Sequence, residues 1–173
     1  MVVRRIRFAV NLMLAGLTAV CLAAPIGYAQ DMSPLSNSIR NMAVKSAPVS
    51  AELAPRAGFS AALQMARGGS GSVTLTVEGV EGTCSQPVRL NIFLNRPDAG
   101  LATPIDDTNF IGFLYLIPRR GQIGRASQAF DLSSVPNLDE RRLTVTLVPV
   151  AGESETPKDL SLVIGRIYLQ REQ

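Results

Sequence analysis

The chain has 173 residues, 17 of them basic and 14 acidic, and it contains two cysteines but no histidine and no tryptophan. Without histidine it cannot build a Ser-His-Asp triad, a Cys-His dyad or a histidine-ligated zinc, copper or non-haem iron site. We therefore expect a protein that is not an enzyme and that carries no cofactor.

Residues 1–29 have the three-part pattern of a secretory signal peptide. The pattern consists of three arginines, an apolar run and two small residues before the cleavage point: Arg4, Arg5 and Arg7, then Phe8 to Ala24, then Gly27 and Ala29. The alternative is a retained membrane anchor, but the run is short for a membrane span and Asn11 interrupts it. We expect cleavage and export to the periplasm or the medium, with no membrane association afterwards.

Removal of this segment changes the charge balance of the chain. Three of the 17 basic residues leave with it, so 14 basic residues remain beside 14 acidic ones. A formally neutral chain, whose paired arginines are confined to positions 119–120 and 141–142, lacks the clustered basic face that nucleic-acid binding needs. We expect no nucleic-acid partner.

Residues 30–58 are rich in Ser, Ala, Pro and Asn and show no sustained hydrophobic period. A segment of this composition buries little apolar surface. We interpret it as a flexible leader that precedes the folded domain.

Residues 59–171 are expected to form that domain, because apolar and polar side chains alternate there as they do in half-buried strands. The expected strands are FSAALQMAR, SVTLTVE, PVRLNIFLN, LTVTLVP and LSLVIGRIYLQ, which start at Phe59, Ser72, Pro87, Leu143 and Leu160. A further stretch, FIGFLYLIP at 110–118, is apolar on both faces and is expected to be a central strand covered on both sides. Turns with Gly and Pro separate the stretches and no amphipathic helix is evident, which predicts an all-β, antiparallel β-sandwich of six or seven strands.

Cys84 is the one cysteine that remains after residues 1–29, so no internal disulfide is possible. It could be a free buried thiol, a mixed disulfide or a cross-link to a partner. Its place between two expected strands favours a half-buried free thiol. Replacement by serine is then expected to cost about 1 kcal/mol or less.

Four motifs in order along the chain resemble the C-terminal β-sandwich domain of the tyrosinase and polyphenol oxidase family. They are Val77-Glu78-Gly79-Val80-Glu81, Phe93-Leu94-Asn95, Phe110-Ile111-Gly112-Phe113 and Val145-Thr146-Leu147-Val148-Pro149. In those enzymes six histidines on a helical bundle hold two coppers, and the β domain lies over the copper site as a shield. This chain has no histidine and hence no counterpart of the catalytic bundle.

The resemblance implies an exported, non-catalytic accessory module that shields or chaperones a separately encoded type 3 copper oxidase of the tyrosinase class. The alternative is a structural or cell-envelope interaction module with no link to tyrosinases. An enzyme with carboxylate chemistry is the poorest interpretation, because sugar-cleaving sites need a cleft that aromatic residues usually line.

The Pro97–Asn109 loop is the feature in which we expect partner binding, since the family's sandwich covers an entrance to its oxidase. Phe110 at the loop edge is the expected apolar contact, with Asp106 and Asp107 as rim charges. Phe113 and Tyr115 are expected to be core residues. Asp98, Asp106 and Asp107 could alternatively bind calcium, although their spacing matches no known calcium loop.

Overall fold

The computed structural model of the chain describes residues 34–136, residue 138 and residues 141–172. The predicted signal peptide, residues 1–29, lies outside the described residues. Among the helices of the described part, none is long and apolar enough to cross a membrane.

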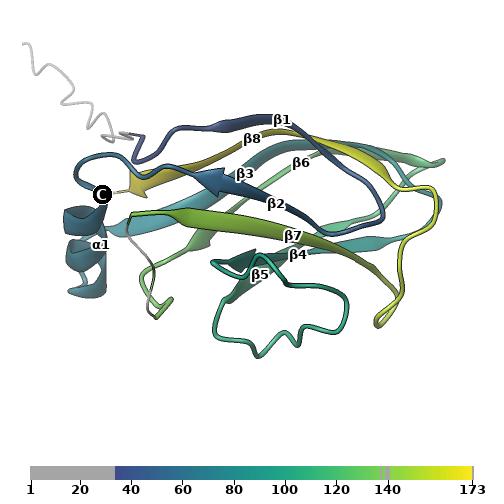
Figure 1. The fold of residues 1–173 in the computed structure, drawn as a ribbon. Helices are drawn as coiled ribbons and strands as arrows, with labels where there is room; N and C mark the ends of the chain where they lie inside the picture. The colour runs from purple at the N-terminus through teal and green to yellow at the C-terminus, as the bar shows by residue number, and fades with distance from the viewer. Residues whose placement is uncertain (1–33, 137, 139–140, 173) are drawn as a thin grey trace, which may run out of the picture.

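Two four-stranded antiparallel sheets pack face to face (Figure 1). The first sheet has the order β1 (Ile39–Val44), β8 (Ser161–Glu172), β3 (Ser72–Thr83) and β6 (Gln122–Asp131). The second has the order β2 (Val49–Leu53), β7 (Leu143–Ala151), β4 (Val88–Leu94) and β5 (Phe110–Leu116). The predicted all-β sandwich is confirmed, with eight strands in the described residues rather than six or seven.

Three strands were not predicted: β1, β2 and β6. The first two come from the segment predicted to be a flexible leader, and for residues 34–58 that prediction is wrong. β1 pairs with β8 and β2 pairs with β7, so each adds one edge strand to a sheet. Met42 and Val44 of β1 and Leu53 of β2 are buried in the core. These strands have only six and five residues, which is too short for a sustained period in the sequence.

Residues Phe59–Arg67, expected to be the first strand, form the helix α1 instead. Its buried residues Phe59, Ala62, Leu63 and Ala66 are spaced three or four apart, so they lie on one face of a helix. Met65, placed inward by the strand interpretation, is 44% exposed. α1 covers one end of the sandwich, where its buried face extends the core (Figure 1).

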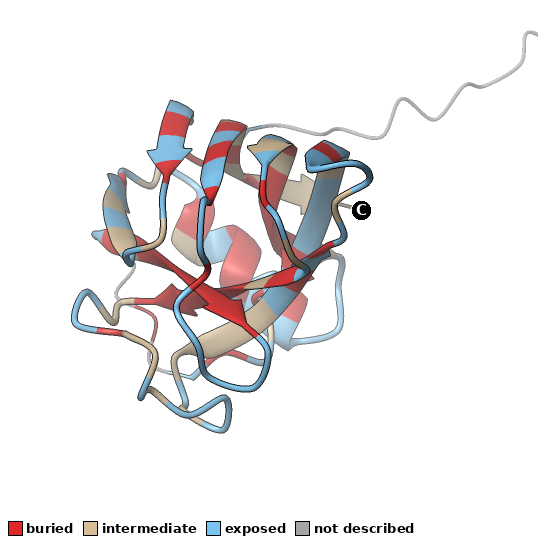
Figure 2. Ribbon diagram, turned by 90° about the vertical axis from the view of Figure 1, so that its right-hand side faces the viewer, coloured by how far each residue is buried: buried red, intermediate tan, exposed pale blue. Residues whose placement is uncertain are grey.

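The core lies between the sheets. Buried and exposed segments alternate along several strands in Figure 2, whereas other strands are buried along most of their length. On β4, for example, Leu90, Ile92 and Leu94 are fully buried on the inner face. Burial of each such side chain is worth about 1.5–3 kcal/mol. The predicted inner faces of the strands at 72–78, 87–95 and 143–149 are therefore confirmed.

The stretch at 110–118 is not the central strand that its apolar sequence predicted. Most of it forms β5, an edge strand that pairs only with β4 among the described strands. Leu114 and Leu116 face the core, whereas Phe113 and Tyr115 face outward and are 45% and 58% exposed. The prediction that Phe113 and Tyr115 are core residues is wrong, because one face of this strand is left open.

Gly112 lets the edge of the second sheet approach the first. Its φ of +145° is one that other residues rarely adopt, and a Cβ there would lie 2.7 Å from Cδ1 of Phe130 on β6. The Phe130 ring occupies the space that a side chain at position 112 would need. The small size of Gly112 thus sets how closely β5 and β6 pack.

The outer face of the first sheet carries a cross-strand ion pair between Glu78 and Arg166. Nη2 of Arg166 lies 2.6 Å from Oε2 of Glu78, and the guanidinium lies 4.1 Å from the centroid of the Tyr168 ring. The hydrogen bond from Arg166 lowers the pKa of Glu78. The pair therefore stabilises the fold above the unfolded-state pKa of Glu78, and this is lost as the pH falls through the folded-state pKa. Both side chains are about two-fifths exposed, so solvent screening keeps the contribution small.

Leu53→Ala tests whether β2 belongs to the folded domain. Leu53 is fully buried, so we expect the substitution to lower the free energy of unfolding by about 2–5 kcal/mol. Urea denaturation followed by circular dichroism measures the change. Glu52→Ala, on the exposed face of the same strand, is the control and should change the value by less than about 1 kcal/mol. Equal, small effects would mean that residues 49–53 are not part of the core.

Gly112→Ala should destabilise the domain by about 2–4 kcal/mol, because it combines backbone strain with a clash against Phe130. Thermal unfolding by calorimetry measures the effect. Gly124→Ala is the matched control: its φ is ordinary and a Cβ there meets no atom within 4 Å. If the two variants unfold at the same temperature, the close approach of β5 and β6 is wrong.

Candidate docking face

The outer face of the second sheet is partly covered by residues 95–109, here called the 95–109 loop, which connects β4 to β5 (Figure 1). A second, smaller hydrophobic cluster lies beneath this loop. It contains Phe93 of β4, Ala99 of the loop, and Val148 and Val150 of β7, with Leu101 and Phe110 packed against them. β4 and β7 are consequently buried on both faces near the loop.

Hydrogen bonds to the strands on either side fix the ends of the 95–109 loop. At its start, Asn95 Oδ1 accepts from the N–H of Thr144 at 3.0 Å. At its end, Asn109 donates through Nδ2 to the carbonyl of Leu94 at 2.7 Å, and its N–H donates to Oδ1 of Asp107 at 2.8 Å. These contacts tie the loop to β4 and β7, so it forms a defined part of the surface.

The structure separates the two aspartates predicted to be rim charges. The carboxylate of Asp107 turns back into the loop, where it is 16% exposed and lies 3.8 Å from Nε of Arg96. Asp106 is exposed and lines a cleft. Asp107 thus shapes the loop, and of the pair Asp106 is the one that an approaching molecule meets.

Phe110 is half-buried against the sheet. Its ring lies 5.4 Å from that of Phe93, centroid to centroid, at a tilt of 59°. This contact places Phe110 beneath the loop as part of the smaller hydrophobic cluster. Neighbouring side chains on β5 expose far more apolar surface.

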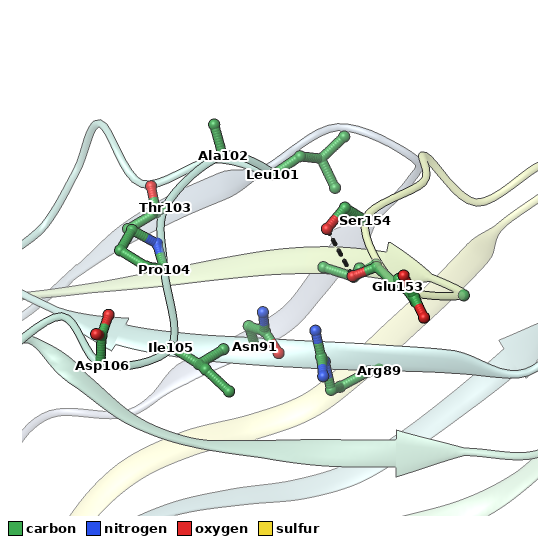
Figure 3. Close-up of a pocket in the computed structure, with 12 residues that line it drawn as sticks. Arg89, Asn91, Leu101, Ala102, Thr103, Pro104, Ile105, Asp106, Glu153 and Ser154 are labelled. Carbon is green, nitrogen blue, oxygen red and sulfur yellow. Dashed lines mark hydrogen bonds between the residues drawn. The ribbon is translucent and has the colours of Figure 1, made fainter.

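The cleft lies between the 95–109 loop and the turn that follows β7, with β4 as its floor (Figure 3). Its volume is about 890 Å³. Arg89 and Asn91 rise from β4, residues 101–106 form one wall, and Gly152, Glu153 and Ser154 form the other. The strand register sets this arrangement, because Arg89 pairs with Val150 and Asn91 with Val148 on β7.

Exposed apolar side chains continue from the cleft along β5. Six large hydrophobic residues are exposed in the described part of the chain, and four of them lie at this face: Ile105, Phe113, Tyr115 and Ile117. Phe113 stands opposite Asn91 and Tyr115 opposite Arg89 in the β4–β5 register. We name these four residues the apolar row. Such a concentration on one face is typical of a protein–protein contact surface.

Sequence reasoning located the loop but missed both the cleft and the apolar row. The alternation along residues 87–95 predicts that Arg89, Asn91 and Phe93 face outward. It does not predict that β5 is an edge strand. The signal that was available is the surplus of apolar residues on the outward face at 113, 115 and 117.

The acidic residues of the loop were also considered as calcium ligands. Within the described residues, no three Asp, Glu, Cys or His side chains gather closely enough to hold a metal ion. Asp98, Asp106 and Asp107 therefore do not converge on one point.

Cys84, the predicted free thiol, follows β3 and is free but 2% exposed, so the expectation of a half-buried side chain is wrong. Its Sγ lies 3.8 Å from the carbonyl oxygen of Lys158. The side chain belongs to the main core, because the segment containing Lys158 folds over it, a contact that local sequence does not reveal.

Comparisons with known proteins place this fold within larger oxidases. No family model matches the sequence, and no curated protein matches it. Among solved structures, recombinant latent aurone synthase, a polyphenol oxidase, superposes with a TM-score of 0.52 at 17% identity, over 76% of this chain and 26% of its own. The enzyme from its natural source gives 0.51 at 18% identity, over 75% and 25%. Latent apple tyrosinase gives 0.49 at 18% identity, over 80% and 27%.

The chain thus spans about a quarter of the length of the oxidases that it matches. At this level of identity the match establishes a shared fold. The fold implied by the four sequence motifs is confirmed: the chain has the β-sandwich architecture of one portion of a latent polyphenol oxidase.

Cys84→Ser should cost more than sequence reasoning predicted, about 1–3 kcal/mol of unfolding free energy, because it places a hydroxyl in a buried apolar site. Cys84→Ala, which introduces no polar atom, should cost less. Urea denaturation under reducing conditions measures both. A serine variant as stable as wild type would show that the site is open to water.

Proposed function

We propose that the chain is an exported accessory module that covers, in trans, the catalytic domain of a separately made polyphenol oxidase. The observation that carries the proposal is the match between three-quarters of this chain and one-quarter of a latent polyphenol oxidase. A module of this fold on a separate chain would act on an oxidase by binding to it.

The absence of histidine supports an accessory role over a catalytic one. Type 3 copper chemistry needs imidazole ligands for two metal ions, and this chain has none to offer. Oxidation of phenols would therefore come from the partner. This module would contribute a surface that binds the partner.

The candidate docking face suits such a role. The apolar row leaves Phe113 45% and Tyr115 58% exposed on the edge strand β5, and Ile117, directly after it, 60% exposed. Aromatic side chains of this kind are the usual anchors of protein interfaces, since they bury a large area with few rotatable bonds. The remainder of the interface is supplied by the 95–109 loop, whose hydrogen-bonded ends lower the entropic cost of docking.

The test measures binding and inhibition with a polyphenol oxidase catalytic domain encoded by the same organism. The chain without residues 1–29 should bind this domain and lower its rate of diphenol oxidation. Phe113→Ser/Tyr115→Ser should weaken binding at least tenfold, because it removes the two aromatic anchors from the interface. Calorimetry gives the affinity and quinone absorbance gives the rate.

Val163→Ser is the matched control, since Val163 is also 43% exposed but lies on β8 of the first sheet. It should bind as wild type does. If wild type binds no such oxidase, the accessory role is wrong. If the control weakens binding as much as the double substitution, the docking face lies elsewhere.

A further inference from the structure

We propose that the cleft between the 95–109 loop and the 152–154 turn binds a segment of a protein partner that inserts a carboxylate between basic neighbours. The carboxylate pairs with Arg89 on the floor, and the flanking cationic side chains meet Asp106 and Glu153 on the walls. The inference rests on the proposed function in taking the occupant to be part of a protein.

The floor of the cleft contains polar atoms without partners. Asn91 is 4% exposed and its Oδ1 has no hydrogen-bond partner among the described residues. Nε of Arg89 is likewise buried without a hydrogen-bond partner there. Both side chains rise from β4 into the cleft (Figure 3). Buried polar atoms in proteins are almost always hydrogen-bonded, so a donor and an acceptor without partners at the floor of the cleft favour a binding role for it.

Arg89 is positioned for an anion. Its guanidinium lies 5.8 Å from the centroid of the Phe113 ring, a cation–π distance that leaves its charge unneutralised. No ion pair of Arg89 occurs within the described residues. The N–H groups of a guanidinium without an ion pair match a carboxylate in geometry and charge.

The walls have the opposite charge from the floor. Asp106 and Glu153 are exposed on opposite sides of the opening, from the loop and from the turn (Figure 3). An occupant with an acidic centre and basic flanks satisfies all three charges at once.

The size and surroundings of the cleft favour a protein segment over a small molecule. Its 890 Å³ has room for several side chains, and Leu101, Ile105 and Val150 give it apolar walls. The apolar row continues from the cleft along β5, so the hydrophobic surface extends well beyond a small ligand.

The probes are two blocked peptides, acetyl-Leu-Lys-Asp-Lys-Leu-amide and the same peptide with Asn in place of Asp. Titration of the isotopically labelled chain without residues 1–29 is followed by nuclear magnetic resonance. The Asp peptide should bind at least tenfold more tightly than the Asn peptide. It should shift the side-chain Nε–H signal of Arg89 and the side-chain amide signals of Asn91.

Substitutions in the cleft separate the contribution of Arg89 on the floor to peptide affinity from the contributions of Asp106 and Glu153 on the walls. Arg89→Gln should abolish the difference between the peptides. Asp106→Asn and Glu153→Gln should weaken both peptides alike, because they remove contacts to the lysines that the two peptides share. Arg125→Gln, on β6 of the first sheet, is the control and should change neither affinity. The spectrum of each variant reports whether it is folded.

Equal affinity for the two peptides, or shifts confined to the first sheet, would overturn the inference. Its failure is distinguishable from failure of the proposed function. An oxidase that docks through the apolar row and is insensitive to Arg89→Gln contradicts only the carboxylate site. An Asp peptide that binds as expected, in a chain that binds no oxidase, contradicts only the accessory role.

Discussion

The burial of two sheet faces against each other is the constraint on which the rest of this structure depends. Each strand of a sandwich turns alternate side chains inward, so the inner face of β4 is fixed by Leu90, Ile92 and Leu94. The same alternation forces Arg89, Asn91 and Phe93 onto the outer face. Everything proposed about binding concerns that outer face, whose composition follows from the demands of the inner one.

The outer face of the second sheet is divided into a covered part and an open part. Near Phe93 the 95–109 loop closes over the sheet and forms a small hydrophobic cluster. Further along β4, the loop and the 152–154 turn stand apart and leave Arg89 and Asn91 at the bottom of a cleft. Beyond the cleft, β5 exposes Phe113 and Tyr115 of the apolar row. A cleft beside an uncovered edge strand is an arrangement that suits recognition of a protein segment.

This β domain matches one-quarter of a latent oxidase. The residue types that it lacks limit its function as much as those that it contains. The sequence supplies no imidazole, so the groups available for function are the guanidinium of Arg89, the amide of Asn91, carboxylates and exposed aromatics. These groups recognise charge and shape. Two proposals rest on these groups: the chain as a cover for an oxidase, and the cleft as a carboxylate site. Either proposal can be wrong while the other is right.

The sequence by itself determined the sandwich, the inner faces of β3, β4 and β7, and the exclusion of histidine chemistry, because strand alternation and residue type are local properties. Tertiary structure decided what depends on distant neighbours. β1 and β2 are strands because β8 and β7 offer them partners, and Phe59–Arg67 is a helix because its apolar side meets the open end of the core. β5 is an edge strand, which exposes Phe113 and Tyr115, and Cys84 is buried by a segment more than 70 residues away in the chain. The cleft forms where β4, the 95–109 loop and the 152–154 turn lie close together. These segments are separate in the sequence, so no single stretch predicts the cleft.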